Sequence, residues 1–488
     1  MKRGANEAGL RRYSSGKRQF ETSKSSFPTA WHSRNLHLLI IRRHAEQRVI
    51  QRFSLDADDF QHGFGLAVFD LGNLQRERAA HHFVESGLKY MGERGVLREL
   101  ELLALAHVGR KDARPTFAGM FAGARILITP LDWGLGHGAR CIPLILRLRE
   151  LDARPIIGAD KGPLALLLDA LPDLPHVRIP GVEVRYAKGP SQTWALATQF
   201  PAMLRSVREE HHLFLNLRRQ LQLDSVISDQ RSGIRAEGLP SVLITHQLFP
   251  FTPFAQGLLR RINLRSVARF DRCWIPDSEE APGLAGELSH GRDTPRNVRY
   301  IGPISRMDPT KVKAPVETYR VVCVISGPEP QRTLLEDELM RQLPAIPGNH
   351  LLVLGRPGSM LDERLGNVHR LGHLGGDALT GALLHAELIV SRTGYTTLMD
   401  LHRIGRPALL IPTPGQHEQE YLGKLHARAG LFHVQAQDRL SIAAVLGKEK
   451  ATDRTTPGTT RAPGASEAGL ERALQDLASL IAHSRSSR

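Results

Sequence analysis

The sequence has few cysteines and no long apolar run, and both absences limit what the protein can be. Its three cysteines, Cys141, Cys273 and Cys323, lie far apart in apolar surroundings without the spacing of a metal site. This predicts reduced core residues in a cytoplasmic protein. No apolar stretch approaches the roughly 20 residues of a membrane-spanning helix, and the basic N-terminus lacks the apolar core and cleavage site of a signal peptide. We therefore expect a cytoplasmic protein that is either soluble or peripheral on the inner face of the plasma membrane.

The charge is strongly basic, with 65 Lys and Arg against 50 Asp and Glu and a net charge of +15. This charge suits nucleic acid, an anionic membrane surface or an anionic small substrate. The basic residues are dispersed, and there is no helix-turn-helix pattern, RNA-binding signature or alternation of aromatic and basic residues. No nucleic acid is expected as a partner, and a non-catalytic basic nucleic-acid-binding protein is kept as an alternative.

Residues 1–119 have the weakest pattern of the chain. They are rich in Arg, His, Ser and Phe with little sustained period, and Met120 stands just before the first strong strand. We interpret 1–119 as a poorly structured N-terminal extension that is poorly ordered or not native. A small helical regulatory domain is the alternative.

Buried strands alternate with helices from residue 125 onward, which predicts an α/β protein with parallel, doubly wound sheets. In the first region the expected strands are 125–129, 155–158, 225–228, 241–245 and 273–276, and the expected helices 139–151, 162–171, 193–222 and 255–270. A Gly–Pro linker leads to a second alternating region. We expect two Rossmann-like domains facing a cleft, at 120–303 and 304–446, and a flexible tail with a short helix at 447–488.

The segment 387–423 carries the strongest functional signal. Ser391–Arg392–Thr393–Gly394 forms a polar turn between a buried strand and a helix, and free N–H groups at such a helix start bind phosphate. A polar loop, 416–420, follows the next strand, at the sheet edge where α/β proteins bind ligands. A diphosphate cradle beside a loop suited to hydroxyl groups indicates a nucleotide-sugar. An ordinary βαβ unit is the alternative for the SRTG turn.

Several motifs resemble those of the GT-B glycosyltransferases, and most closely the MurG-like group with its glycosyltransferase family 28 C-terminal domain. These motifs are GLGH (134–137), ITHQ (244–247), IGPISR (301–306), SRTGYTTLMD (391–400) and HEQEY (417–421). The resemblance covers about 125–433 and is stronger in the second domain. Two departures stand out: the first loop of the second domain reads SGPEPQR, in which Pro328 and Pro330 remove N–H donors, and Asp400 is one methylene shorter than the family's glutamate.

The resemblance implies a UDP-sugar as co-substrate and assigns a donor site to the second domain. It places Asp400 at the ribose and Gln419 and Glu420 at the donor sugar, while Arg332 is suited to clamp a phosphate bidentately. A solvated arginine is the alternative for Arg332. The expected donor-binding residues are Ser326, Gly327, Gln331, Arg332, Ser391, Arg392, Thr393, Gly394, Tyr395, Thr396, Thr397, Asp400, Gln416, Glu418, Gln419 and Glu420.

Two residues of the first domain are candidates for catalysis. His137, at the edge of a glycine loop, suits a general base or a group that orients the acceptor, and a structural hydrogen bond is its alternative role. Asp229, after a strand, is the second candidate, or else a helix cap. The expected acceptor side comprises Asp132, Trp133, Gly134, Gly136, Arg140, His246 and Gln247. No metal-binding pair of aspartates stands in a suitable place, so we expect no metal and no cofactor, with helix N-termini and arginine stabilising the diphosphate.

A run of apolar anchors followed by arginines suits an anionic membrane surface, and a buried helix is the alternative. It comprises Leu248, Phe249, Phe251, Phe254, Arg260 and Arg261. A membrane position would make the acceptor lipid-linked.

The sequence as a whole predicts a hexosyltransferase that is inverting and metal-independent. It would move a sugar from UDP-N-acetylglucosamine or another UDP-hexose to an acceptor hydroxyl. A UDP-sugar epimerase or hydrolase on the same fold, and a non-catalytic sugar-nucleotide sensor, are alternatives.

Overall fold

The computed structural model describes residues 36–44, 47–55, 121–181, 192–252, 255–312, 317–327, 329–451 and 463–487. The chain divides into two compact units, 1–111 and 112–488. In the first unit an antiparallel strand pair is described, β1 (Leu36–His44) with β2 (Gln47–Leu55), which the sequence does not predict. The rest of the expected N-terminal extension lies outside the described residues.

The first domain of the larger unit is built on a seven-stranded parallel sheet with the order β5-β4-β3-β6-β7-β8-β9. Its strands are β3 (Arg125–Pro130), β4 (Arg154–Ala159), β5 (His176–Arg178), β6 (Ser225–Asp229), β7 (Ser241–Ile244), β8 (Arg272–Ile275) and β9 (Val298–Tyr300). The central strands β3, β6 and β7 are buried along nearly their whole length because helices cover both faces of the sheet.

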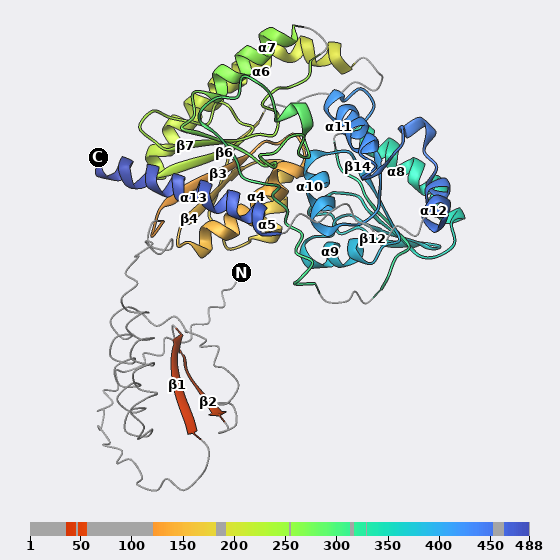
Figure 1. Ribbon diagram of the computed structural model, residues 1–488, viewed down its shortest axis with the longest axis horizontal. Helices are drawn as coiled ribbons and strands as arrows, with labels where there is room; N and C mark the ends of the chain where they lie inside the picture. Colours follow the sequence, from red (N-terminus) through yellow and green to blue (C-terminus); the bar gives the residue numbers. More distant parts are fainter. Residues whose placement is uncertain are drawn as a thin grey trace, which may run out of the picture. The chain divides into compact units, whose positions relative to one another are not determined.

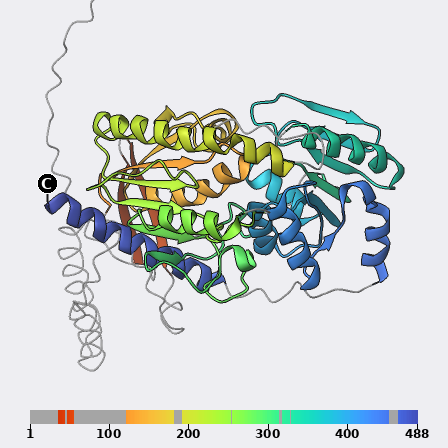
Figure 2. The same ribbon diagram turned by 90° about the horizontal axis from the view of Figure 1, so that it is seen from above.

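Three helices pack on one face of this sheet: α4 (Leu135–Glu150), α5 (Lys161–Ala170) and the C-terminal α13 (Pro463–Ser486). The long α6 (Gln192–Gln220) packs on the other face, where Phe214 contacts the apolar side chains of β3 and β6. Figures 1 and 2 show α13 lying against the first domain and α6 on the opposite side of the sheet. The helix α7 (Gln256–Val267) follows β7.

The second domain repeats this architecture with the sheet order β12-β13-β11-β10-β14-β15-β16. Its strands are β10 (Val321–Val324), β11 (His350–Val353), β12 (Asp362–Leu365), β13 (Val368–Leu371), β14 (Leu388–Arg392), β15 (Ala408–Ile411) and β16 (His433–Val434). All pairs are parallel except the edge pair β12–β13, an antiparallel hairpin. The helices are α8 (Gln331–Gln342), α9 (Gly376–Leu384), α10 (Tyr395–Ile404), α11 (His417–Arg428) and α12 (Ile442–Ala451). Two facing doubly wound domains are therefore confirmed.

Each domain also takes part of its core from elsewhere in the chain. Leu284 and Leu288, which follow β8, pack into the core of the second domain, while Leu474 and Leu477 of α13 pack into the core of the first. The short helix expected in the tail is present as α13 and is longer than predicted, and its buried apolar side chains hold it against the first domain. The spacer 452–462 lies outside the described residues.

The run expected at a membrane surface is for the most part an inner layer. Leu248 and Phe249 are 0% and 2% exposed, and the Arg260 guanidinium lies 4.0 Å from the centre of the Phe249 ring. The Phe251 ring packs against the Tyr421 ring at an interplanar angle of 51°. The expectation that these side chains insert into a membrane is therefore wrong for Leu248 and Phe249. Arg261 is exposed, and Phe254 lies outside the described residues. Among the described residues no helix has both the length and the apolar content needed to cross a membrane.

Candidate functional site

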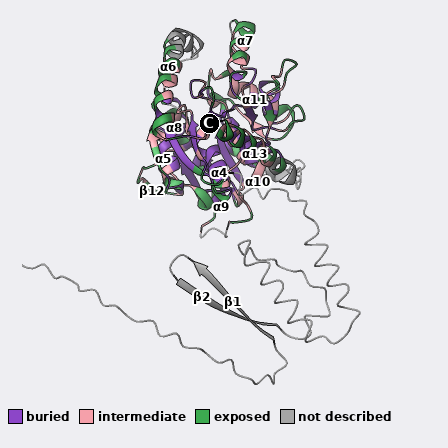
Figure 3. Cartoon of the chain, turned by 90° about the vertical axis from the view of Figure 1, so that its left-hand side faces the viewer, coloured by how far each residue is buried: buried purple, intermediate pink, exposed green. Residues whose placement is uncertain are grey.

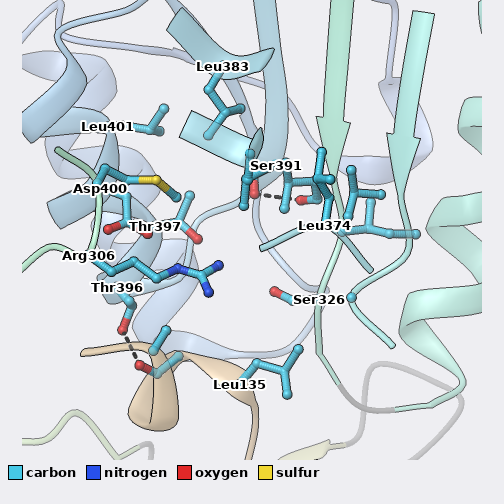
Figure 4. A pocket seen from close by; sticks show the side chains of 18 of the residues that line it. Leu135, Arg306, Ser326, Leu374, Leu383, Ser391, Thr396, Thr397, Asp400 and Leu401 are labelled. Atoms are coloured by element: carbon cyan, nitrogen blue, oxygen red, sulfur yellow. Dashed lines mark hydrogen bonds between the residues drawn. The ribbon is translucent and has the colours of Figure 1, made fainter. Parts of the chain in front are cut away.

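A cavity of about 90 Å³ lies where the first turn of α4 meets the C-terminal edge of the second sheet (Figure 4). The first domain contributes Leu135, Gly136, Ala139 and Leu166, and the linker contributes Arg306 and Met307. From the second domain come the polar residues Ser326, His373, Ser391, Thr396, Thr397 and Asp400, together with apolar side chains of β10, β11, β14, α9 and α10. The cavity is therefore shared by both domains.

Arg306 is the cation that the structure adds to this site. Its guanidinium extends into the cavity between Asp400 and Ser326 (Figure 4). Its buried Nε has no hydrogen-bond partner within the described part of the chain. The sequence-based donor set omits Arg306, although its place at the end of the IGPISR linker motif is a usable signal. A cation with free donor capacity, directed into a cavity, suits an anionic ligand.

Asp400, expected at the ribose, does line the cavity. Its Oδ1 accepts a 2.6 Å hydrogen bond from the Ser305 hydroxyl. Burial raises the pKa of Asp400 from 3.8 to about 6, against the opposing effects of Arg306 and Ser305. A carboxylate held here by one short hydrogen bond has further acceptor capacity for hydroxyl groups.

The raised pKa of Asp400 predicts how stability depends on pH. Between pH 3.8 and about 6 the folded state binds more protons at this site than the unfolded state, so stability falls as the pH rises through this window. The Asp400→Asn variant cannot ionise. Between pH 4 and pH 7 we expect the wild type to lose about 2 kcal/mol of unfolding free energy relative to Asp400→Asn. Urea denaturation across this range measures it, and a constant difference contradicts the prediction.

The SRTG turn opens α10 as expected, but its side chains divide between two tasks. The N-cap Gly394 has no side chain to cap the helix, and Thr396 and Thr397 in the first turn line the cavity. Ser391 also lines it, although its hydroxyl donates to the Val324 carbonyl at 2.7 Å. The first turn of α10 thus presents backbone N–H groups without a side-chain cap, as an anion site needs.

Arg392, Thr393 and Tyr395, all expected at the donor, are not among the residues that line the cavity. Arg392 is 2% exposed and donates to the carbonyls of Gln331 and Ile411, which ties β14 to α8 and β15. Thr393 is fully buried. Tyr395 donates to the Pro276 carbonyl at 2.7 Å, in the first domain. These residues position the turn instead of contacting the cavity.

The loop before α8 already has an anion of its own. The Glu329 carboxylate accepts hydrogen bonds from the Thr333 N–H and hydroxyl and pairs with Arg332. The Arg332 guanidinium, expected to bind a phosphate, is therefore paired with the Glu329 carboxylate of the same loop. Gln331 is 5% exposed and does not line the cavity. Ser326 lines the cavity, whereas Gly327 does not.

The side chains of the polar loop 416–420 form hydrogen bonds within the loop region and with the first domain. Gln419 Oε1 accepts from the Thr413 N–H and Glu420 Oε1 from the Gly415 N–H, both at 2.9 Å, while Gln416 is the N-cap of α11. Glu418 Oε1 lies 2.7 Å from Nε2 of His246 in the first domain. None of these side chains lines the cavity, and the expected contacts of Gln419 and Glu420 with a donor sugar stay a prediction.

His137 and Asp229, far apart in the sequence, form a hydrogen-bonded pair. His137 Nδ1 lies 2.9 Å from Asp229 Oδ1, and the side chains are 18% and 0% exposed. Burial raises the pKa of Asp229, but Arg140 and His137 outweigh it and lower the value from 3.8 to about 2. Nδ1 of His137 lies 2.9 Å both from the Asp229 carboxylate, which only accepts, and from Nη2 of Arg140, which only donates. A proton on Nδ1 satisfies Asp229 and is the tautomer that leaves the lone pair on Nε2. Asp229 is thus a positioning residue beneath His137.

Several residues expected on the acceptor side are buried between the domains. Arg140 is 2% exposed, and its guanidinium is used by Asp229, His246 and His137. It is therefore not available to a phosphate or an acceptor. His246 is 3% exposed and its ring stacks on Tyr395, with centroids 4.2 Å apart. Gln247 donates to Glu418.

The remaining acceptor-side residues lie around the start of α4. Asp132, Trp133 and Gly134 form the half-buried loop between β3 and α4, and Gly136 lies in the first turn of the helix. Thr396 donates to the Gly136 carbonyl at 3.1 Å, so this turn touches the second domain directly. Across the described residues no group of three His, Cys, Asp or Glu side chains could hold a metal ion, and metal independence stays a prediction.

The comparison with protein families supports the resemblance to glycosyltransferases in the second domain. Residues 377–455 match the family model of the glycosyltransferase family 28 C-terminal domain, which confirms the resemblance inferred from the SRTGYTTLMD motif for this part of the chain. No curated protein matches the sequence.

Solved structures that resemble the chain are distant. The glycosyltransferase SnogD from Streptomyces nogalater is 18% identical, covering 74% of this chain and 95% of its own, with a TM-score of 0.46. MurG from Acinetobacter baumannii is 14% identical, covering 74% and 99%, with a TM-score of 0.40. LpCGTa, solved in complex with UDP, is 16% identical, covering 74% and 99%, with a TM-score of 0.47.

Proposed function

We propose that this protein is a glycosyltransferase that moves a hexose from a UDP-sugar to an acceptor hydroxyl, with inversion and without a metal. The observation that carries the proposal is the cavity itself. Arg306 and the uncapped start of α10 supply positive charge, and Asp400 supplies a hydroxyl acceptor. The match of residues 377–455 to a glycosyltransferase domain supports the same conclusion.

In the proposed reaction, Nε2 of His137 takes the proton of the acceptor hydroxyl as its oxygen attacks the anomeric carbon of the donor. The bond between that carbon and the diphosphate oxygen breaks on the face opposite the attacking oxygen, so the configuration of the anomeric carbon is inverted. The leaving diphosphate gathers negative charge, and Arg306 together with the N–H groups at the start of α10 stabilises it.

The donor needs more space than the cavity offers. Sites for small molecules measure about 300–1,000 Å³, against about 90 Å³ here. The hydrogen bond from Thr396 to the Gly136 carbonyl closes one side. We propose that α4 and α10 separate to admit the donor.

Arg306→Met tests the donor site by thermal shift. We expect UDP and UDP-sugars to raise the melting temperature of the wild type, and the UDP dissociation constant to rise about 10- to 100-fold in Arg306→Met, because a charge-assisted contact is lost. The control is Arg364→Met, whose guanidinium is 54% exposed and paired with Glu317 away from the cavity, and which should bind UDP as the wild type does. If no uridine nucleotide shifts the wild-type melting temperature, the proposed function fails.

Release of UDP should then be assayed with soluble and with lipid-linked acceptors. A lipid-linked acceptor is included because α7 exposes Leu258 (60%) and Ile262 (41%) next to Arg261. Figure 3 shows exposed stretches along α7. This face differs from the apolar run expected from the sequence.

A further inference from the structure

A chain of hydrogen bonds runs from α11 of the second domain to His137 of the first. Glu418 Oε1 lies 2.7 Å from His246 Nε2, and His246 Nδ1 lies 3.3 Å from Nη1 of Arg140. Nε and Nη2 of Arg140 bind the two carboxylate oxygens of Asp229, and Asp229 Oδ1 lies 2.9 Å from His137 Nδ1. Nη2 of Arg140 also lies 2.9 Å from the same His137 Nδ1, so Arg140 contacts His137 directly as well as through Asp229. Glu418 is the one member of this chain that belongs to the second domain.

The chemistry of the end groups fixes the protons along this chain. Arginine only donates, so His246 Nδ1 must accept from Arg140, and the Glu418 carboxylate only accepts, so His246 Nε2 must carry the proton. Burial lowers the pKa of His246, although Glu418 acts in the opposite direction. Neutral His246 in the Nε2–H form is therefore the state that satisfies both neighbours.

Every member of the chain is held in one place. Arg140 and Asp229 are 2% and 0% exposed, and the His246 ring is stacked on Tyr395 with an interplanar angle of 4°. Gln247 donates to the second carboxylate oxygen of Glu418. Without Glu418, Nε2 of His246 loses its hydrogen-bond acceptor. The His246 ring is then no longer fixed as the acceptor for Nη1 of Arg140.

We propose that Glu418 is a positioning residue through which docking of the second domain sets the orientation of the candidate base His137. In this proposal His246 and Arg140 transmit the position of Glu418 to Asp229, and Asp229 orients the imidazole. The base is then fully aligned when α11 is docked on the first domain. The link to turnover rests on the proposed glycosyl transfer, whereas the hydrogen-bond chain does not.

Other contacts between the domains do not join this chain and supply a matched control. Tyr421, also on α11, accepts a 2.8 Å hydrogen bond from the Glu287 N–H, in the segment of the first domain that packs into the core of the second. Tyr421→Phe removes an interdomain hydrogen bond from the same helix without touching His246 or Arg140.

The chain itself is tested without any substrate by NMR of protein labelled with ¹⁵N-histidine. We expect one imidazole in the Nε2–H form with a downfield-shifted proton, assigned by its loss in His246→Gln. The signal should disappear or move in Glu418→Ala and persist in Tyr421→Phe. An Nδ1–H form of His246 overturns the proposal, because that nitrogen could not accept from Arg140.

The link to turnover is tested by a double-mutant cycle on kcat. Glu418→Ala should lower kcat about tenfold or more in the wild-type background and less than about twofold in the Asp229→Asn background, since coupled residues are non-additive. Glu418→Gln, which keeps an oxygen acceptor while Gln247 turns its amide, should recover much of the loss. Tyr421→Phe should have the same effect in both backgrounds.

Equal effects of Glu418→Ala in both backgrounds overturn the proposed link. A wild type that binds no uridine nucleotide refutes the proposed function, yet the NMR result still decides whether the chain exists.

Discussion

Replacement of His137 by alanine should abolish measurable sugar transfer, lowering kcat by about 10²- to 10⁴-fold, the usual contribution of a general base. In the proposed mechanism Nε2 of His137 carries the lone pair that takes the acceptor proton, while its Nδ1 donates to Asp229 at 2.9 Å. His137 does not line the cavity that would receive the donor, so stabilisation by UDP should be retained.

The measurement is UDP release at saturating donor, with UDP thermal shifts on the same samples. His212→Ala, at an exposed histidine of α6 in the same domain, is the control and should keep wild-type turnover. Asp229→Asn should also lower kcat, because an asparagine can offer its amide group in place of the carboxylate and so favour the wrong tautomer of His137. Turnover within twofold of wild type in His137→Ala would remove this residue from the mechanism.

The second large effect is expected on stability, in the Arg231→Met variant. The Arg231 guanidinium is fully buried, bonded to Glu210 at 2.5 Å and 3.4 Å from Asp132. It also donates to the carbonyls of Ile179 and Pro180 at 3.0 and 2.7 Å. Removing the cation leaves two carboxylates and two carbonyls without their partner.

Burial already raises the pKa of both Glu210 and Asp132, with Arg231 the main opposing influence. Breaking a buried ion pair on one side typically costs about 3–5 kcal/mol, which corresponds to a melting temperature lower by about 6–20 °C for a domain of this size. Arg341→Met is the control, since its side chain is 69% exposed in an i,i+3 pair with Glu338 and such pairs contribute less than about 1 kcal/mol. Similar losses in both variants would contradict the predicted role of Arg231.

Much of the fold follows from local patterns. The apolar runs at 321–325 and 408–411 are strands because helices cover both faces of their sheet, and the expected helix after the SRTG turn matches α10. The prediction of the donor side in the second domain rests on the same kind of pattern: a polar turn at a strand end opens a helix whose N-cap residue provides no side-chain cap. Asp400 is directed toward the cavity from the second turn of that helix.

The GLGH segment shows where local rules fail. Two glycines within four residues predict a loop, yet α4 begins at Leu135. Close packing explains why glycine occupies these helical positions. A Cβ on Gly136 would lie 2.9 Å from Thr396 Oγ1, and one on Gly138 would lie 3.3 Å from Pro163 Cα. The glycines serve the approach of other elements, which no local pattern reveals.

The sequence by itself determined the two α/β domains, the position of the polar turn and the residue types that a nucleotide-sugar site needs. The tertiary structure decided which of those residues meet. Glu418 and Arg332 are as polar as a donor site requires, but the first bonds His246 of the other domain and the second pairs with Glu329. Arg306, which looked like part of a linker, is the cation directed into the cavity (Figure 4). The physical reason is that the partner of a charged side chain is set by how strands and helices distant in the sequence are brought together, and this packing leaves no periodic trace in the sequence.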